Sequence, residues 1–123
     1  MTAELTFATT RREDPLPAAE RETILANPAF GTTFTDHMVT ATWTKGKGWH
    51  DGQVRPFGPL SVSPAAAVLH NAQEVFEGMK AYRHGDGTIA LFRPEANAAR
   101  FNLSAERLAM PTVPVEDFVR AVE

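Results

Sequence analysis

The sequence predicts an α+β fold in which helices cover an antiparallel sheet. Two observations lead to this class. A stretch rich in Thr, Val and Trp, residues 34–44, is followed by turn glycines and a further short strand, and residues 64–110 then give a helix, a hairpin and a second helix in that order. The chain has 123 residues, of which 43% are hydrophobic and 22% are charged. This is the composition of an ordinary globular domain.

The first predicted element is a helix that follows an irregular arm. Residues 1–16 show no periodicity and are expected to form the arm, so that the domain itself spans residues 17–123. Pro17 suits the first turn of a helix over residues 17–27, which ends before Pro28.

The next elements are two strands and a helix. Glycines within residues 45–48 predict a turn after the first strand, and one short strand is expected around residues 53–57, with a loop after it. Ser63 offers a hydroxyl cap and Pro64 suits a first helical position. A helix is therefore expected from Pro64 until Gly78 ends it.

A hairpin and two further helices complete the predicted elements. The stretches "MKAYRH" and "TIALFR" flank "GDG" at residues 85–87, which is typical of a hairpin turn. Residues 94–110 then read as a long helix, with one apolar stripe formed by Ala98, Phe101, Ala105 and Leu108. A last helix begins at residue 115 and is still running at Glu123, which is typical of part of a longer protein.

Composition excludes several classes of function. A formal charge of −3 and the lack of any Lys/Arg run argue against a nucleic-acid partner. The chain has no cysteine, its four histidines do not fall at ligand spacing, and no metal site is expected. No apolar run approaches the roughly 20 residues of a membrane span, and the first residues lack a signal-peptide pattern. A soluble, cytoplasmic protein is expected.

A few side chains could carry chemistry, and each has a plainer reading. Lys80 lies in an apolar strand, where it is either a reactive amine or a lysine with a solvated head. Glu77 is a candidate base or a structural carboxylate, and Asp36-His37 has no nucleophile beside it. Arg100 would either bind a phosphate or carboxylate with its planar fork or lie on a helix surface. Residue types and spacing alone show no catalytic site.

Three stretches of the chain nevertheless resemble the N-terminal part of branched-chain amino acid aminotransferases, of the branch found in actinobacteria and eukaryotes. They are "FGTTFTDHMVTATW" (30–43), "GWHDGQVRPFGPLSVSP" (48–64) and "LHNAQEVFEGMKAYRHGDGTIALFRPEANAAR" (69–100). The resemblance implies the smaller domain of a fold-type-IV enzyme that uses pyridoxal 5′-phosphate and lacks its C-terminal end here.

The resemblance also implies an activity and its partners. Members move the amino group of leucine, isoleucine or valine to 2-oxoglutarate, which gives glutamate and a branched-chain 2-oxo acid, and they act as homodimers. Their Schiff-base lysine would lie beyond residue 123, and Lys45, Lys47 and Lys80 do not match it. No catalytic residue is therefore expected in this chain, which should be inactive alone.

The same resemblance nominates four site residues. Arg100 matches the arginine that holds the cofactor phosphate, and Phe30 and Phe76 match aromatic residues that line the pocket for the substrate side chain. Asn71 stands where the family usually has a tyrosine facing the substrate. Because of that change, a D-amino acid aminotransferase or an aminodeoxychorismate lyase of the same fold type stays open as an alternative. A non-catalytic binding module that keeps the fold is the other alternative.

Overall fold

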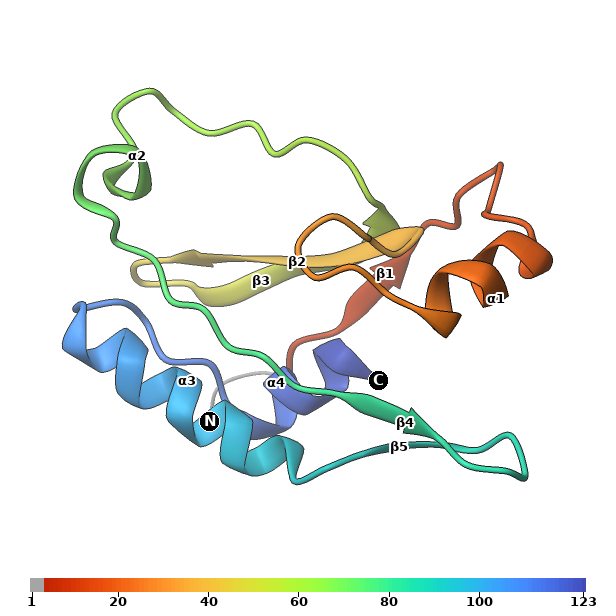
Figure 1. Cartoon of the computed structure of the whole chain (residues 1–123). Helices are drawn as coiled ribbons and strands as arrows, with labels where there is room; N and C mark the ends of the chain where they lie inside the picture. The colour runs from red at the N-terminus through yellow and green to blue at the C-terminus, as the bar shows by residue number, and fades with distance from the viewer. Residues whose placement is uncertain (1–3) are drawn as a thin grey trace. The chain divides into compact units, whose positions relative to one another are not determined.

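The computed structural model describes residues 4–123, so the first three residues of the expected arm lie outside the described residues. The chain divides into two compact units, residues 1–60 and 61–123, which are described separately. Figure 1 labels the helices and strands of both units. The coarse prediction of a mixed helix and strand structure is confirmed.

The first unit contains one helix and a three-stranded sheet. Its elements are β1 (Phe7–Thr9), α1 (Ala18–Ala26), β2 (His37–Thr44) and β3 (Gly48–Pro56). The strand order is β1-β3-β2, with β2 antiparallel to β3 and β1 parallel to it. The predicted helix and the predicted antiparallel pair are confirmed, whereas the parallel strand β1 lies in the segment expected to be an irregular arm.

Strand β3 is longer than the short strand expected around residues 53–57. A β-bulge explains the difference, because Asp51 and Gly52 of β3 fall between the pairs Thr40↔Gln53 and Thr42↔His50. Asp51 has φ 53°, a left-handed conformation that aspartate tolerates better than most residues. The Asp-Gly pair therefore bends the strand without ending it.

Glycine at position 52 also allows β1 to approach β3. Phe7 pairs with Gly52, and a Cβ added at that glycine would collide with the backbone carbonyl of Thr6. Beyond the strand, the Thr10 N–H donates to the Val54 carbonyl at 2.8 Å. The parallel pairing thus depends on the absence of a side chain at position 52.

The second unit contains three helices and a two-stranded hairpin. Its elements are α2 (Ala67–Asn71), β4 (Ala81–Arg83), β5 (Ile89–Leu91), α3 (Pro94–Arg107) and α4 (Val115–Val122). The hairpin is antiparallel, and Asp86 closes its turn by accepting hydrogen bonds from the Thr88 N–H and hydroxyl at 2.9 and 2.7 Å. The predicted hairpin and the last two predicted helices are confirmed.

The helix expected from Pro64 to Gly78 is much shorter in the structure. Helix α2 ends at Asn71, and Ala72 takes a left-handed conformation with φ 48°. The following residues run extended, and the Gln73 side chain donates to the Leu108 carbonyl at 2.8 Å. Long-range contacts to α3 and its C-terminal end thus replace the helical pattern that the sequence favours locally.

The apolar stripe of α3 packs as predicted over most of its length. Ala98 and Ala105 are fully buried, and the Phe101 ring lies 5.4 Å from the Phe118 ring of α4. The two alanines leave little bulk on this face, so the backbones of packed helices can approach closely. Leu108 lies one residue beyond the helix and stays exposed.

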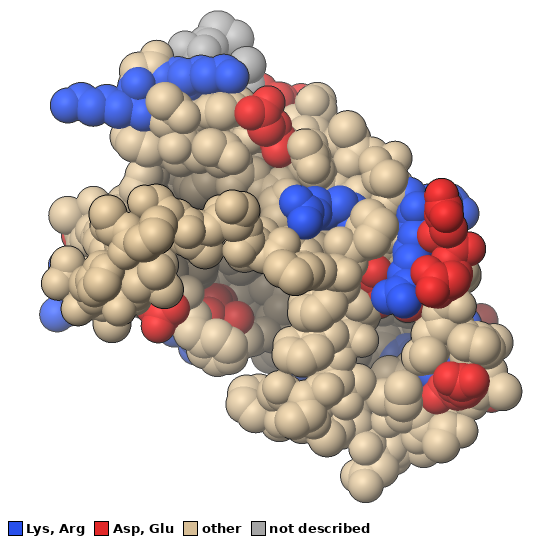
Figure 2. All heavy atoms as spheres, turned by 90° about the horizontal axis from the view of Figure 1, so that it is seen from above, with Lys and Arg blue, Asp and Glu red and all other residues tan. Residues whose placement is uncertain are grey.

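Large apolar side chains are exposed in both units. The chain has 9798 Å² of accessible surface, against roughly 7,900 Å² expected for two separate compact units of half its mass. Uncharged residues occupy most of the face that Figure 2 shows. The accessible surface therefore exceeds that of two compact units, and many large apolar side chains contribute to it. No helix among residues 4–123 is both long enough and apolar enough to cross a membrane.

Asn102 connects α3 to the loop that precedes α4. Its amide donates to the Val113 carbonyl at 2.7 Å and accepts from the Val113 N–H at 2.9 Å. Replacing Asn102 by Ala leaves both backbone groups without this partner, which should reduce the free energy of unfolding by about 1–3 kcal/mol. Urea unfolding measures the loss. Asn102→Asp, which keeps the acceptor and removes the donor, should lie between the wild type and Asn102→Ala, and equal stability of all three proteins would contradict the assignment.

Candidate functional site

The main polar cluster of the second unit joins the extended segment before β4 to α3. Arg100 donates from Nε to one carboxylate oxygen of Glu77 at 2.8 Å and from Nη2 to the other at 2.5 Å. Such a bidentate pair fixes the plane of the guanidinium as well as its distance from the carboxylate. In the structure, Arg100, which was nominated from the sequence as an anion-binding residue, is thus paired with the acidic residue Glu77.

Two further donors hold Glu77. Its Oε1 accepts from Asn97 Nδ2 at 2.9 Å and from the Gly78 N–H at 3.0 Å, and its side chain is only 6% exposed. Hydrogen bonds to the charged form favour ionisation. The bonds from Arg100 and Asn97 therefore lower the pKa of Glu77 to about 2, against the opposing effect of burial.

Arg100 remains open to solvent despite this pair. Its side chain is 68% exposed, and the carboxylate of Glu77 raises its pKa further above the ordinary value. Glu77 occupies the edge formed by Nε and Nη2, and within residues 4–123 no hydrogen bond from Nη1 is present. A guanidinium has five N–H donors, so the edge formed by Nη1 and Nη2 fits a phosphate or carboxylate group.

Within the described residues, the side-chain hydrogen bonds of Arg100 go to Glu77 and not to Asn71, the other polar residue nominated for the site. Asn71 is the last residue of α2 and is exposed, and the Phe76 ring is 82% exposed. Phe30 is 94% exposed and belongs to the first unit. The described part of the second unit therefore joins Arg100 to Glu77 and Asn97, not to the aromatic residues or Asn71.

The plainer readings of Glu77 and Lys80 agree with the structure, but the sequence did not indicate the partner of Glu77. The pairing of Glu77 with Arg100 spans 23 residues, and no local pattern indicates it; the plainer reading of Glu77 as a structural carboxylate fits its contacts. Lys80 is exposed just before β4, which agrees with a solvated head. Asn97 was not singled out, and nothing in its helix spacing marks it.

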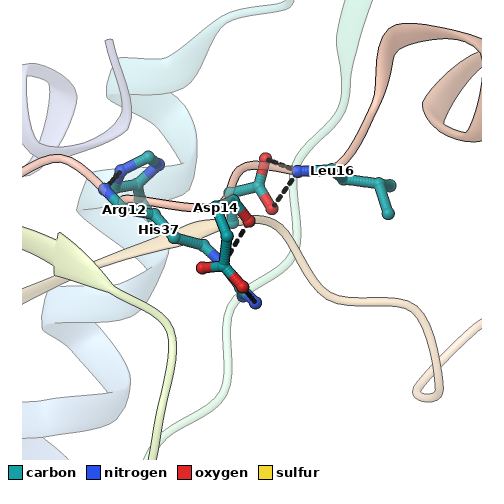
Figure 3. Close-up of polar contacts among 5 residues, drawn as sticks. Arg12, Asp14, Leu16 and His37 are labelled. Atoms are coloured by element: carbon teal, nitrogen blue, oxygen red, sulfur yellow. Dashed lines mark hydrogen bonds and ion pairs between the residues drawn. The ribbon is translucent and has the colours of Figure 1, made fainter.

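A second polar cluster ties residues 12–16 to β2 in the first unit. The Arg12 N–H donates to His37 Nε2 at 2.9 Å, and the Leu16 N–H donates to both oxygens of Asp36 at 3.2 Å. Figure 3 shows how Arg12, Asp14, Leu16 and His37 lie in this cluster. Arg12 also pairs with Asp14 at 3.0 Å. Asp36 and His37 therefore accept backbone donors, which favours a structural role over that of a base.

A cavity of about 440 Å³ lies beside this second cluster, between the arm, α1 and the loop before β2. Its walls are largely apolar and include the stacked rings of Phe34 and Phe57, 4.7 Å apart. Asp36 reaches its lining, but that carboxylate already accepts from Leu16. Among residues 4–123 no group of three or more His, Asp or Glu side chains is placed to hold a metal ion.

The environment of Glu77 predicts its titration. Because Arg100 and Asn97 stabilise the carboxylate, its pKa should be found at about 2, and the contribution of this group to stability should be complete above its ordinary pKa of about 4.3 and decline as the pH falls below that value. A ¹³C NMR titration of the Glu77 carboxyl carbon measures this. In Arg100→Gln the value should return toward the ordinary range, and an ordinary pKa in the unmodified protein would contradict the contact.

The chain is similar in sequence to known branched-chain-amino-acid aminotransferases. No family model matches it. It is 61% identical over 109 residues to a probable branched-chain-amino-acid aminotransferase of Streptomyces coelicolor, an alignment that covers 89% of this chain and 30% of that protein. It is 52% identical over 118 residues to the branched-chain-amino-acid aminotransferase of Mycolicibacterium smegmatis, covering 96% of this chain and 32% of that protein.

The similarity extends to eukaryotic proteins. The cytosolic branched-chain-amino-acid aminotransferase of Mus musculus is 42% identical over 118 residues, which is 96% of this chain and 28% of the mouse protein. The chain thus spans about 30% of the length of the curated relatives it matches. Over that segment, it is a relative of the branched-chain-amino-acid aminotransferases.

Proposed function

We propose that the protein to which this chain belongs is a pyridoxal-phosphate-dependent branched-chain amino acid aminotransferase. The observation that carries the proposal is the 61% identity to a relative of that name over 89% of this chain. The exposed Arg100 supports it, since within residues 4–123 the edge formed by Nη1 and the second N–H of Nη2 makes no hydrogen bond. Residues 17–123 would belong to the smaller domain of a fold-type-IV enzyme, with residues 1–16 as its arm.

Arg100 is the residue of this chain proposed to hold the cofactor. Its free edge presents N–H donors to a phosphate group, a geometry that suits bidentate oxyanion binding. Pyridoxal phosphate, when bound, supplies the electron-withdrawing system that stabilises charge on the amino acid. The part that this chain plays is to hold the phosphate so that the reactive end of the cofactor keeps one position.

Phe30, Phe76 and Asn71 are proposed to contact the substrate. Both rings are exposed and would gain apolar contact with the side chain of leucine, isoleucine or valine, at about 0.8 kcal/mol for each buried methylene. Asn71 is exposed and offers an amide donor and an acceptor. The amino-group acceptor would be 2-oxoglutarate, which yields glutamate.

Further parts of the proposal concern the whole protein. We expect a cytoplasmic homodimer, and we expect the lysine that binds the cofactor covalently to be encoded beyond residue 123. The 123-residue chain would then be inactive alone. The exposed apolar side chains of both units are consistent with contact surfaces for further polypeptide.

A transamination assay of the full-length protein tests the proposed activity. Incubation with L-leucine and 2-oxoglutarate should give glutamate and the branched 2-oxo acid, with pyridoxal phosphate retained on purification. D-alanine should be a far poorer donor, because the pocket is expected to suit branched L-amino acids. Preference for D-alanine would indicate the D-amino acid aminotransferase, and a protein that binds no cofactor and transfers no amino group would indicate a binding module.

The role of Arg100 is tested separately. Arg100→Ala removes a charged donor of the proposed phosphate site, which should weaken the retention of pyridoxal phosphate by about 1.5–3 kcal/mol. Equilibrium dialysis of the full-length protein measures the change. Arg107→Ala, on the same helix, provides the control for loss of an arginine, and unchanged affinity in Arg100→Ala would make Arg100 a surface residue.

A further inference from the structure

We propose that Glu77 and Asn97 are positioning residues that hold Arg100 by one edge of its guanidinium and leave the Nη1–Nη2 edge facing outward for the cofactor phosphate. This inference rests on the proposed function. It assigns no chemistry to Glu77 or Asn97. Both act through Arg100.

The exposure of the two partners shows which one is fixed. The Glu77 side chain is 6% exposed and the Arg100 side chain is 68% exposed. A lone arginine at that exposure has many rotamers open to it and would lose that freedom when it binds an anion. Glu77 removes part of this freedom in advance, because a carboxylate that is itself held restricts the guanidinium to one plane.

Asn97 and Gly78 are what hold the carboxylate. Asn97 Nδ2 donates to Glu77 Oε1 at 2.9 Å and to the Gly78 carbonyl at 3.0 Å, and the Gly78 N–H donates to the same Oε1 at 3.0 Å. Asn97 and Arg100 lie three residues apart on α3 and therefore project from the same face. Helix α3 thus supplies both the anion-binding side chain and the amide that sets the position of its partner.

The Arg100 atoms that Glu77 contacts determine which edge of the guanidinium stays available for an anion. Both of its oxygens accept from the Nε and Nη2 side of the guanidinium. The adjacent edge, Nη1 with the second N–H of Nη2, can form a parallel pair of hydrogen bonds with an oxyanion. One arginine can therefore hold Glu77 and a phosphate at the same time.

The carboxylate has a second, opposing effect on an anion. Its negative charge lies on the neighbouring edge of the guanidinium, next to the phosphate, and repels it. We expect the loss of orientation to outweigh the relief of this repulsion, because each anion has its own pair of N–H donors. Asn97→Ala isolates the positioning effect, since it loosens Glu77 without changing any charge.

The test compares pyridoxal phosphate with pyridoxal, which lacks the phosphate, in the full-length protein. Equilibrium dialysis of each ligand is performed with wild type, Asn97→Ala, Glu77→Gln and the control Glu95→Gln, an exposed acid in the first turn of the same helix. Asn97→Ala should weaken the binding of pyridoxal phosphate about three- to tenfold, the effect of losing one ordinary hydrogen bond. Glu77→Gln should weaken it further, and Glu95→Gln should leave it unchanged.

The affinity for pyridoxal distinguishes positioning from a general structural effect. If Glu77 and Asn97 act through Arg100, both variants should bind pyridoxal as the wild type does. Equal weakening of both ligands, unchanged affinity for pyridoxal phosphate, or tighter binding by Glu77→Gln would each overturn the inference. A wild-type protein that binds no pyridoxal phosphate would instead overturn the proposed function, so the two failures are distinguishable.

Discussion

The ion pair between Glu77 and Arg100 is the contact on which the site in the second unit depends. It links an extended segment that has no regular hydrogen bonding of its own to a fourteen-residue helix. An exposed ion pair contributes little to stability, but here the carboxylate is buried and accepts from the Asn97 amide and the Gly78 N–H as well. The contact therefore sets the plane and direction of the Arg100 guanidinium.

Elements with local signals could be predicted from the sequence, and elements set by distant partners could not. The hairpin over "GDG" and the last two helices follow from turn glycines, a proline at the first helical position and an apolar stripe. Strand β1 carries no such signal, since its partner is Gly52 on β3. Helix α2 does have a local signal, but it is shorter than that signal predicts. The residues after it instead contact α3 and Leu108.

The candidate site was predictable only in part for the same reason. Arg100 was weighed as an anion binder from its chemistry and was assigned a phosphate through a family resemblance. Its partner Glu77 is 23 residues away, and neither helical nor strand periodicity connects the two. The exposed rings of Phe30 and Phe76 are unusual in a protein that stands alone.

The parallel pairing of β1 with β3 constrains the order in which the first unit assembles. Strands β2 and β3 are neighbours in sequence joined by a tight turn, so their loop closes at low entropic cost and their pairing is a fast local event. Phe7 and Gly52 are far apart in the sequence, so we expect the β1–β3 pairing to follow the hairpin. During synthesis β1 emerges first and cannot pair with β3 until β3 has left the ribosome as well.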